Sequence, residues 1–146
     1  MPTLPWIRPE KPAPDADTDY LVFGSRFVVL SPKWTVRFVV GTVRLLDQMR
    51  HAEGCIALSL KADLLEGCFW TVSIWKAPGY LTKFAKTEPH AAISRGLAPA
   101  MKEVTFTTWK RPSSAKIPPT WRDIQQRILA AKAESDAGGG GHDAGR

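Results

Sequence analysis

The hydrophobic residues follow two different periods along the chain, and each change of period marks the boundary of an expected element. Residues 20–30 are rich in β-branched and aromatic side chains, which is typical of a strand. Ser31-Pro32 then favours a helix start, because serine caps helices and proline suits their first position. The apolar residues that recur at helical spacing after this point are Trp34, Phe38, Leu45 and Met49. They predict a helix that ends near Arg50.

An alternation of apolar with small or polar residues predicts a β-hairpin in the middle of the chain. Its two strands are expected at residues 55–64 and 68–76, with Glu66-Gly67 as the turn between them. Because side chains alternate across a strand, the second strand has two distinct faces. One face carries Trp70, Val72 and Ile74, and the other carries Phe69, Thr71, Ser73 and Trp75.

A second helical region follows the hairpin and is divided by Pro89, since a proline inside a helix loses a backbone hydrogen bond. We therefore expect a fresh helix from Pro89 to about Ala98, with Thr87 or Glu88 as its cap. Residues 103–110 form the fourth predicted strand.

The predicted order, βαββαβ followed by a C-terminal helix, is that of the ferredoxin-like split βαβ fold. The fold class is therefore α+β, with an antiparallel sheet and its helices on one face. The other face is left open and carries large apolar side chains, each of which gains about 1.5–3 kcal/mol on burial. Two such faces would cover each other in a symmetric pair. We therefore expect a homodimer in the form of a dimeric α/β barrel.

Proline and glycine divide the chain into four predicted parts. Residues 1–19 contain five prolines and predict an extended N-terminal arm. Residues 20–111 form the ferredoxin-like domain, and residues 112–134 a linker and an amphipathic helix. Residues 135–146 are a flexible glycine-rich tail.

Charge and composition narrow the expected partners. The 146 residues carry a formal net charge of +6, but the basic residues are interleaved with acidic ones, and the longest basic cluster is Lys110-Arg111. A nucleic-acid-binding face usually gathers its basic residues in a stripe, so we expect no nucleic-acid partner. Prolines stand where a signal peptide would be apolar, and no apolar run reaches the ~20 residues of a membrane span. We therefore expect a cytoplasmic protein without a membrane partner.

One block of the sequence resembles a known superfamily. The block consists of residues 69–76, from Phe69 to Lys76, followed by Leu81, Phe84, Pro89 and His90. It is similar to the dimeric α/β-barrel superfamily of antibiotic-biosynthesis monooxygenases and, more distantly, heme-degrading and spheroidene monooxygenases. Nearer still is a group of uncharacterised actinobacterial proteins, which also share Leu4-Pro5-Trp6 and the segment Pro118-Pro119-Thr120-Trp121.

This resemblance implies a βαββαβ dimer with a pocket between the sheet and the helices of each subunit. In the monooxygenase branches that pocket binds an aromatic substrate or heme. The heme-ligating histidine of the heme-degrading branch falls on Ser94, not on His90. A serine cannot replace an imidazole as an iron ligand, so the resemblance does not extend to heme degradation.

His90 is the first candidate site residue, because it lies in the first turn of a predicted helix. A neutral imidazole there could act as a catalytic base, donate a hydrogen bond or bind a metal; alternatively, His90 is a structural residue at the helix break. Arg26, in the middle of a strand, could hold a substrate carboxylate or phenolate, or lie over apolar surface at a rim. Trp34, Trp75 and Phe84 could form the aromatic walls of the pocket, or be core.

The sharpest hypothesis is a cofactor-independent monooxygenase that acts on an aromatic or polyketide-like compound. His90 would be its base and Arg26 would bind the anion. One alternative is a barrel that binds a ligand without catalysis or is purely structural, and another is heme binding through His90. The three histidines do not have metal-ligand spacing, so we expect no metal site.

Overall fold

The computed structural model describes residues 3–9, 19–112 and 119–138. Its elements in chain order are β1 (Asp19–Val29), α1 (Pro32–Arg50), β2 (Cys55–Asp63), β3 (Cys68–Trp75), α2 (Pro78–Lys86), α3 (His90–Leu97), the short 3₁₀ helix η1 (Ala98–Ala100), β4 (Met101–Pro112) and α4 (Trp121–Gly138). This order confirms the predicted α+β class and the βαββαβ arrangement with a C-terminal helix.

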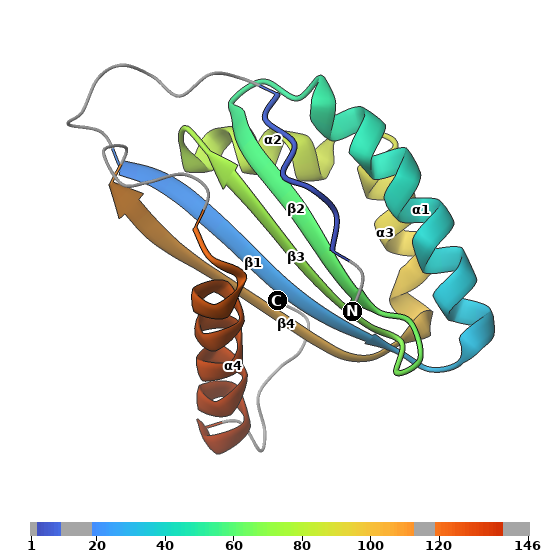
Figure 1. Cartoon of the computed structure of the whole chain (residues 1–146). Coiled ribbons are helices and arrows are strands. Elements are labelled where there is room, and N and C mark those ends of the chain that lie inside the picture. The colour runs from blue at the N-terminus through green and yellow to red at the C-terminus, as the bar shows by residue number, and fades with distance from the viewer. Residues whose placement is uncertain (1–2, 10–18, 113–118, 139–146) are drawn as a thin grey trace.

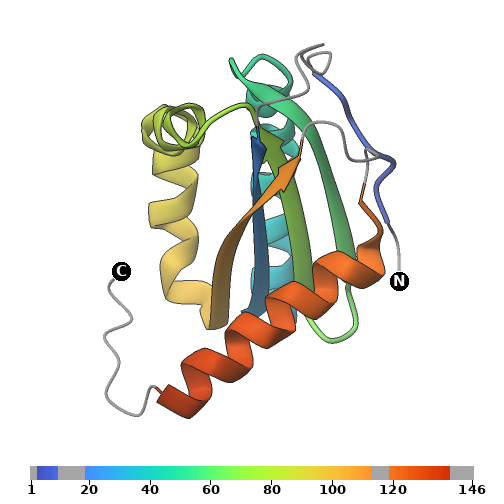
Figure 2. The ribbon, with the colours of Figure 1, turned by 90° about the vertical axis from the view of Figure 1, so that its left-hand side faces the viewer.

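The four strands form one antiparallel sheet in the order β2-β3-β1-β4. β1 is therefore central, with Leu21 opposite Trp75 of β3 and Lys110 of β4. The helices α1, α2 and α3 cover one face of this sheet, while α4 lies across the other (Figures 1 and 2). The predicted hairpin is confirmed, because β2 and β3 pair directly.

Alternation along β1 decides which side chains meet which layer. Phe27 packs against Phe38 of α1, with ring centroids 5.4 Å apart, so the odd-numbered residues of β1 face the three helices. Gly24 instead lies against Ile128 of α4. The even-numbered residues, among them Arg26, therefore face α4.

α4 changes the prediction about the open face of the sheet. Ile124 and Ile128 of this helix are both fully buried in a cluster with apolar side chains of β1, β2 and β3. Trp6 and Trp121 pack against the same cluster. The face is covered by its own chain, which corrects the reason for expecting a homodimer; the dimer itself stays a prediction.

The structure adds detail to the two terminal segments of the chain. Within the N-terminal arm, Thr3 and Ile7 form antiparallel bridges with Lys61 and Leu58 of β2. α4 continues to Gly138, beyond its predicted end at residue 134. Residues 10–18 of the arm, 113–118 of the linker and 139–146 of the tail lie outside the described residues.

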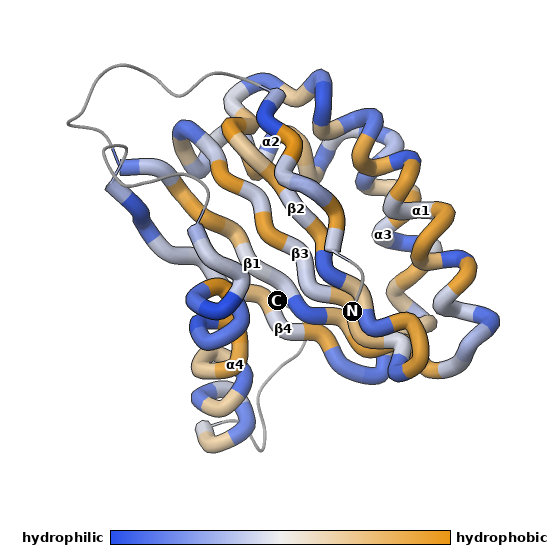
Figure 3. The backbone as a smooth tube through the Cα atoms, viewed as in Figure 1, coloured by the Kyte–Doolittle hydropathy of each residue, from blue (hydrophilic) through white to orange (hydrophobic). Residues whose placement is uncertain are grey.

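The outer surface of α1 carries exposed apolar side chains. Phe38 is buried on the inner side, where its ring stacks on Phe69 at 4.1 Å. The exposed apolar residues of the outer side are Val36, Val39, Val40 and Val43, and Figure 3 shows apolar segments along this helix. Among the described residues, no helix is both long and apolar enough to cross a membrane.

Candidate functional site

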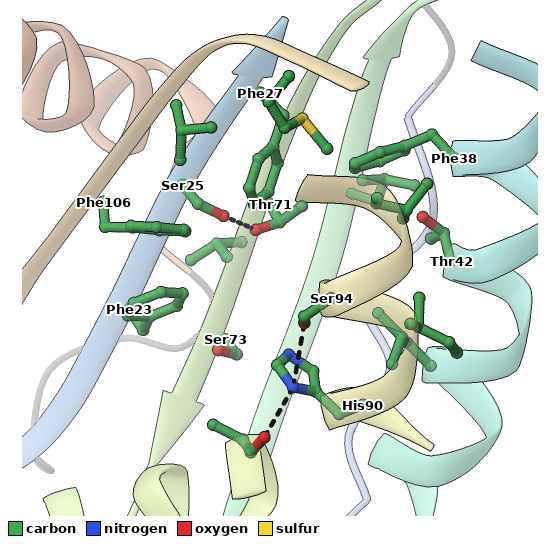
Figure 4. Close-up of a pocket in the computed structure, with 18 of the residues that line it drawn as sticks. Phe23, Ser25, Phe27, Phe38, Thr42, Thr71, Ser73, His90, Ser94 and Phe106 are labelled. Carbon is green, nitrogen blue, oxygen red and sulfur yellow. Dashed lines mark hydrogen bonds between the residues drawn. The ribbon is translucent and has the colours of Figure 1, made fainter. Parts of the chain in front are cut away.

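A cavity of about 1370 Å³ lies between the sheet and the three helices that cover it (Figure 4). Residues of β1 and β3 form the floor of the cavity. One wall is formed by α1 and a second wall by α2 and α3. β4 contributes Phe106 at its rim. This is the place in which the resemblance predicts a ligand pocket.

Phenylalanines form an aromatic wall on the β1 and β4 side of the cavity. The rings of Phe23 and Phe106 stack with their centroids 5.6 Å apart, and Phe27 meets Phe106 edge-on at 5.6 Å. Phe106 remains half exposed. The wall therefore offers a planar apolar ligand a ring surface for stacking. The sequence analysis missed these residues, although the alternation Phe23, Ser25, Phe27 was the signal that could have found them.

Three hydroxyl groups lie on the floor, and none of them carries a charge. The hydroxyls of Ser25 and Thr71 hydrogen-bond to each other across β1 and β3. The Ser73 hydroxyl accepts a hydrogen bond from Nε1 of Trp75 at 2.8 Å. Since each hydroxyl can both donate and accept, this strip suits a neutral carbonyl or hydroxyl oxygen of a ligand.

His90 projects from the first turn of α3 into the cavity (Figure 4). Its Nδ1 lies 3.0 Å from the carbonyl oxygen of Ala85 and 3.4 Å from the hydroxyl of Ser94. A carbonyl oxygen only accepts, so Nδ1 carries the hydrogen and donates it. In the neutral ring this leaves the lone pair on Nε2. The structure therefore provides a basic nitrogen at the wall of an apolar cavity.

Gln48 of α1 fixes the start of α3, and the sequence analysis did not identify it. Its Oε1 accepts a hydrogen bond from the backbone N–H of His90 at 2.9 Å. Its Nε2 donates to the carbonyls of Phe84 at 3.4 Å and Thr87 at 3.3 Å. The predicted caps, Thr87 and Glu88, were wrong: the cap position is Pro89, and no side chain there forms a cap bond.

Replacing Gln48 by alanine is expected to destabilise the protein by about 0.5–2 kcal/mol, the usual cost of losing a helix N-cap. The His90 ring should also change its environment, because the first turn of α3 loses its tie to α1. Urea denaturation measures the first effect, and the NMR signals of the His90 ring report the second. Asp47→Ala, at the exposed neighbouring position, is the control, and equal effects of the two substitutions would contradict this role.

Of the three aromatic residues that were predicted to line the cavity, Phe84 does so and the two tryptophans do not. Phe84 is buried and lines it, with its ring centroid 5.0 Å from that of His90. Trp75 lies behind Phe84, at 5.5 Å between centroids, and belongs to the core. Trp34 packs with a separate cluster around Phe38, and neither tryptophan lines the cavity.

Arg26 requires a correction, because its side chain lies on the α4 face of the sheet and not in the cavity. Its guanidinium lies 5.4 Å from the ring centroid of Trp70 and 3.6 Å from the carboxylate of Glu103. Burial raises the pKa of the neighbouring Cys68 thiol above its ordinary value, although the charge of Arg26 acts in the opposite direction. The guanidinium is therefore part of a structural cluster beneath α4.

No family model and no curated protein matches the sequence, but solved structures share the fold. SnoaB, a cofactor-independent oxygenase from Streptomyces nogalater, in a mutant form, is 12% identical, with a TM-score of 0.56 over 70% of this chain and 100% of that one. An antibiotic biosynthesis monooxygenase is 17% identical, with a TM-score of 0.53 over 68% of this chain and 99% of that one. A conserved protein from Methanosarcina mazei Go1 is 18% identical, with a TM-score of 0.57 over 63% of this chain and 92% of that one.

These similarities confirm, at the level of the fold, the resemblance that the sequence predicted. They span nearly the whole of the matched chains and about two thirds of this one. The chain therefore has the ferredoxin-like α+β fold of antibiotic-biosynthesis monooxygenases, with additional segments of its own.

Proposed function

We propose that this protein binds a small aromatic or polyketide-like molecule in the cavity beneath α1, α2 and α3 and oxygenates it without a cofactor. The observation that carries the proposal is that His90 lines an aromatic cavity while, among the described residues, the hydrogen bonds of its ring are made by Nδ1 and leave Nε2 available. Its Nδ1 is held by the carbonyl of Ala85 at 3.0 Å, which fixes the ring and its tautomer. SnoaB supports the proposal, because a protein described as a cofactor-independent oxygenase uses this fold.

The chemistry needs a base, a dry site and a substrate that itself reduces dioxygen. His90 Nε2 takes a proton from an activated methylene of the substrate, which leaves an electron-rich carbanion. The net change is a methylene and dioxygen giving a carbonyl and water, so all the electrons come from the substrate. The phenylalanine wall gives the substrate an apolar surface, and the hydroxyls of Ser25 and Thr71 can bind a substrate oxygen.

Anthrone is a suitable probe, because its methylene lies between two aromatic rings and its oxidation product is a quinone. We expect the protein to accelerate oxygen uptake with anthrone, and His90→Ala to lower the rate by about 10²–10⁴-fold, the usual contribution of a general base. His51→Ala is the control, since His51 is exposed and lies outside the cavity. An unchanged rate in His90→Ala would refute the role of His90, and no uptake by the wild type would refute oxygenation of this substrate class.

Binding without catalysis is the first alternative, and it predicts a different pair of results. Anthrone would then change the tryptophan fluorescence of the protein, yet oxygen uptake would stay at the uncatalysed rate. Phe106→Ala should weaken this binding in either case, because it removes half of the stacked pair at the rim.

Heme binding is the second alternative, because a free imidazole nitrogen is an ordinary axial ligand for heme iron. The cavity could supply one such axial ligand, because His90 is the one histidine among the described residues that line it. Bound heme would supply redox-active iron, and His90 Nε2 would hold it. A Soret band on titration with hemin, lost in His90→Ala, would favour this alternative over cofactor-free oxygenation.

A further inference from the structure

The apolar face of the sheet needs a cover, and in this chain α4 lies across it. We propose that α4, together with Trp6, takes the place of a second subunit by closing this face within its own chain. A second copy is then excluded from pairing sheet to sheet. This inference concerns the face opposite the cavity and does not depend on the proposed function.

The contact between α4 and the sheet is that of a protein core. Ile124 and Ile128 are one helical turn apart and are both 0% exposed. They belong to one cluster with residues that β1 and β3 direct to this face, namely Tyr20, Val22, Trp70, Val72 and Ile74. Burying two isoleucines stabilises the docked helix by about 3–6 kcal/mol relative to leaving both exposed.

Gly24 allows α4 to approach β1 closely, because it has no side chain. A Cβ atom at this position would lie 3.0 Å from Cγ1 of Ile128 and 3.1 Å from Cζ3 of Trp109. Even an alanine there would therefore require the side chains of Ile128 and Trp109 to move by a few tenths of an ångström. The ring of Trp109 in turn packs under the guanidinium of Arg127, at 5.2 Å. The backbone of β1 is thus shaped for this helix at close range.

Polar contacts fix α4 to both edges of the sheet. Near its start, Gln125 accepts a hydrogen bond from Lys61 of β2 at 3.4 Å. Near its end, Lys132 lies 3.5 Å from the carboxylate of Glu103 of β4. These two pairs favour the same direction of α4 as the apolar packing does.

The N-terminal segment completes the cover beside the start of α4. The rings of Trp6 and Trp121 lie 6.5 Å apart, and both pack against the apolar cluster. The hydroxyl of Ser59 on β2 donates a hydrogen bond to the carbonyl of Leu4 at 2.7 Å, which holds the segment next to the sheet. The N-terminal segment and the start of α4 therefore meet over the face that a partner would need.

A disulfide trap tests whether the helix belongs to its own chain. Gly24→Cys and Ile128→Cys, in a background of Cys55→Ala and Cys68→Ala, bring two thiols within reach of each other, because a Cβ at position 24 would lie 3.0 Å from Cγ1 of Ile128, whose place a cysteine Sγ can take. We expect mild oxidation at low micromolar concentration to give an intramolecular disulfide, seen as a monomer on a non-reducing gel. A covalent dimer would show that α4 is exchanged between copies, and the absence of a disulfide would show that α4 is undocked; either result overturns the proposal.

A second test opens the face in the full-length chain. Ile128→Asp places a carboxylate against the sheet and should release α4, so that light scattering shows a higher mass than the 16.1 kDa of one chain. Leu129→Asp, at the exposed neighbouring position, is the matched control and should leave the mass unchanged. A wild-type dimer that Ile128→Asp dissociates would overturn the proposal. Circular dichroism identifies an unfolded variant, and the disulfide test then decides.

Discussion

Replacing Trp75 by alanine is expected to lower the free energy of unfolding by about 3–5 kcal/mol, the usual cost of removing a large aromatic side chain from a core. Its side chain is 0% exposed, and its Nε1 donates a hydrogen bond to the Ser73 hydroxyl. The substitution would leave a void beside Phe84, which the Trp75 ring supports at 5.5 Å. His90 packs on the other side of Phe84. We therefore expect the change in packing to reach the cavity through the Phe84 ring.

Urea denaturation of Trp75→Ala and Trp34→Ala compares a core tryptophan with a partly exposed one. Trp34 lies in a different cluster and keeps one face under the guanidinium of Arg37. We expect the smaller loss for Trp34→Ala. If Trp75→Ala instead kept full stability and lost only ligand binding, Trp75 would be a wall of the cavity, as the sequence analysis predicted.

Replacing Gly54 by alanine is expected to lower the free energy of unfolding by about 1–3 kcal/mol through backbone strain alone. Gly54 has a φ of +83°, which side chains with a Cβ rarely adopt, and its new Cβ would lie 2.3 Å from Cγ of Tyr80. The overlap adds to the backbone cost, because Tyr80 must move. Since Tyr80 lies in the first turn of α2, we expect the wall that α2 gives to the cavity to shift with it.

Thermal unfolding measures this cost, and Gly79→Ala in the first turn of α2 is the control. A Cβ at Gly79 meets nothing within 4 Å, so alanine there should not lower the stability of the protein. Similar melting temperatures for both variants would show that the turn at Gly54 tolerates a Cβ.

The fold was predictable because each element has a clear local pattern. The alternation in residues 68–75 specified β3 and its two faces, and Pro89 separated α2 from α3. Both features depend on a few neighbouring residues, whose backbone preferences the tertiary structure does not override. The length of α4 was less predictable, since a frayed helix end has no comparable pattern.

The site was less predictable because its assembly depends on long-range contacts. Arg26 was assigned to the cavity from its residue type, but it shares a strand face with Gly24, which meets α4. Gln48 contacts the start of α3 across more than forty positions of sequence, and no local pattern identifies such a cap. The surface that α4 covers could not be predicted for the same reason, since the apolar stripe of a helix does not say which surface it meets.

The bridges between the N-terminal segment and β2 leave the sheet with two unlike edges. Leu4 and Ile7 donate backbone hydrogen bonds to Leu60 and Leu58 at 2.7 and 3.0 Å, so the outer side of β2 is occupied. Within the described part of the chain, no strand pairs with the outer side of β4. Among the described residues, the backbone groups with which an added strand from another molecule could pair therefore lie along β4 rather than β2. We would expect an edge-to-edge contact between copies of this chain to use β4.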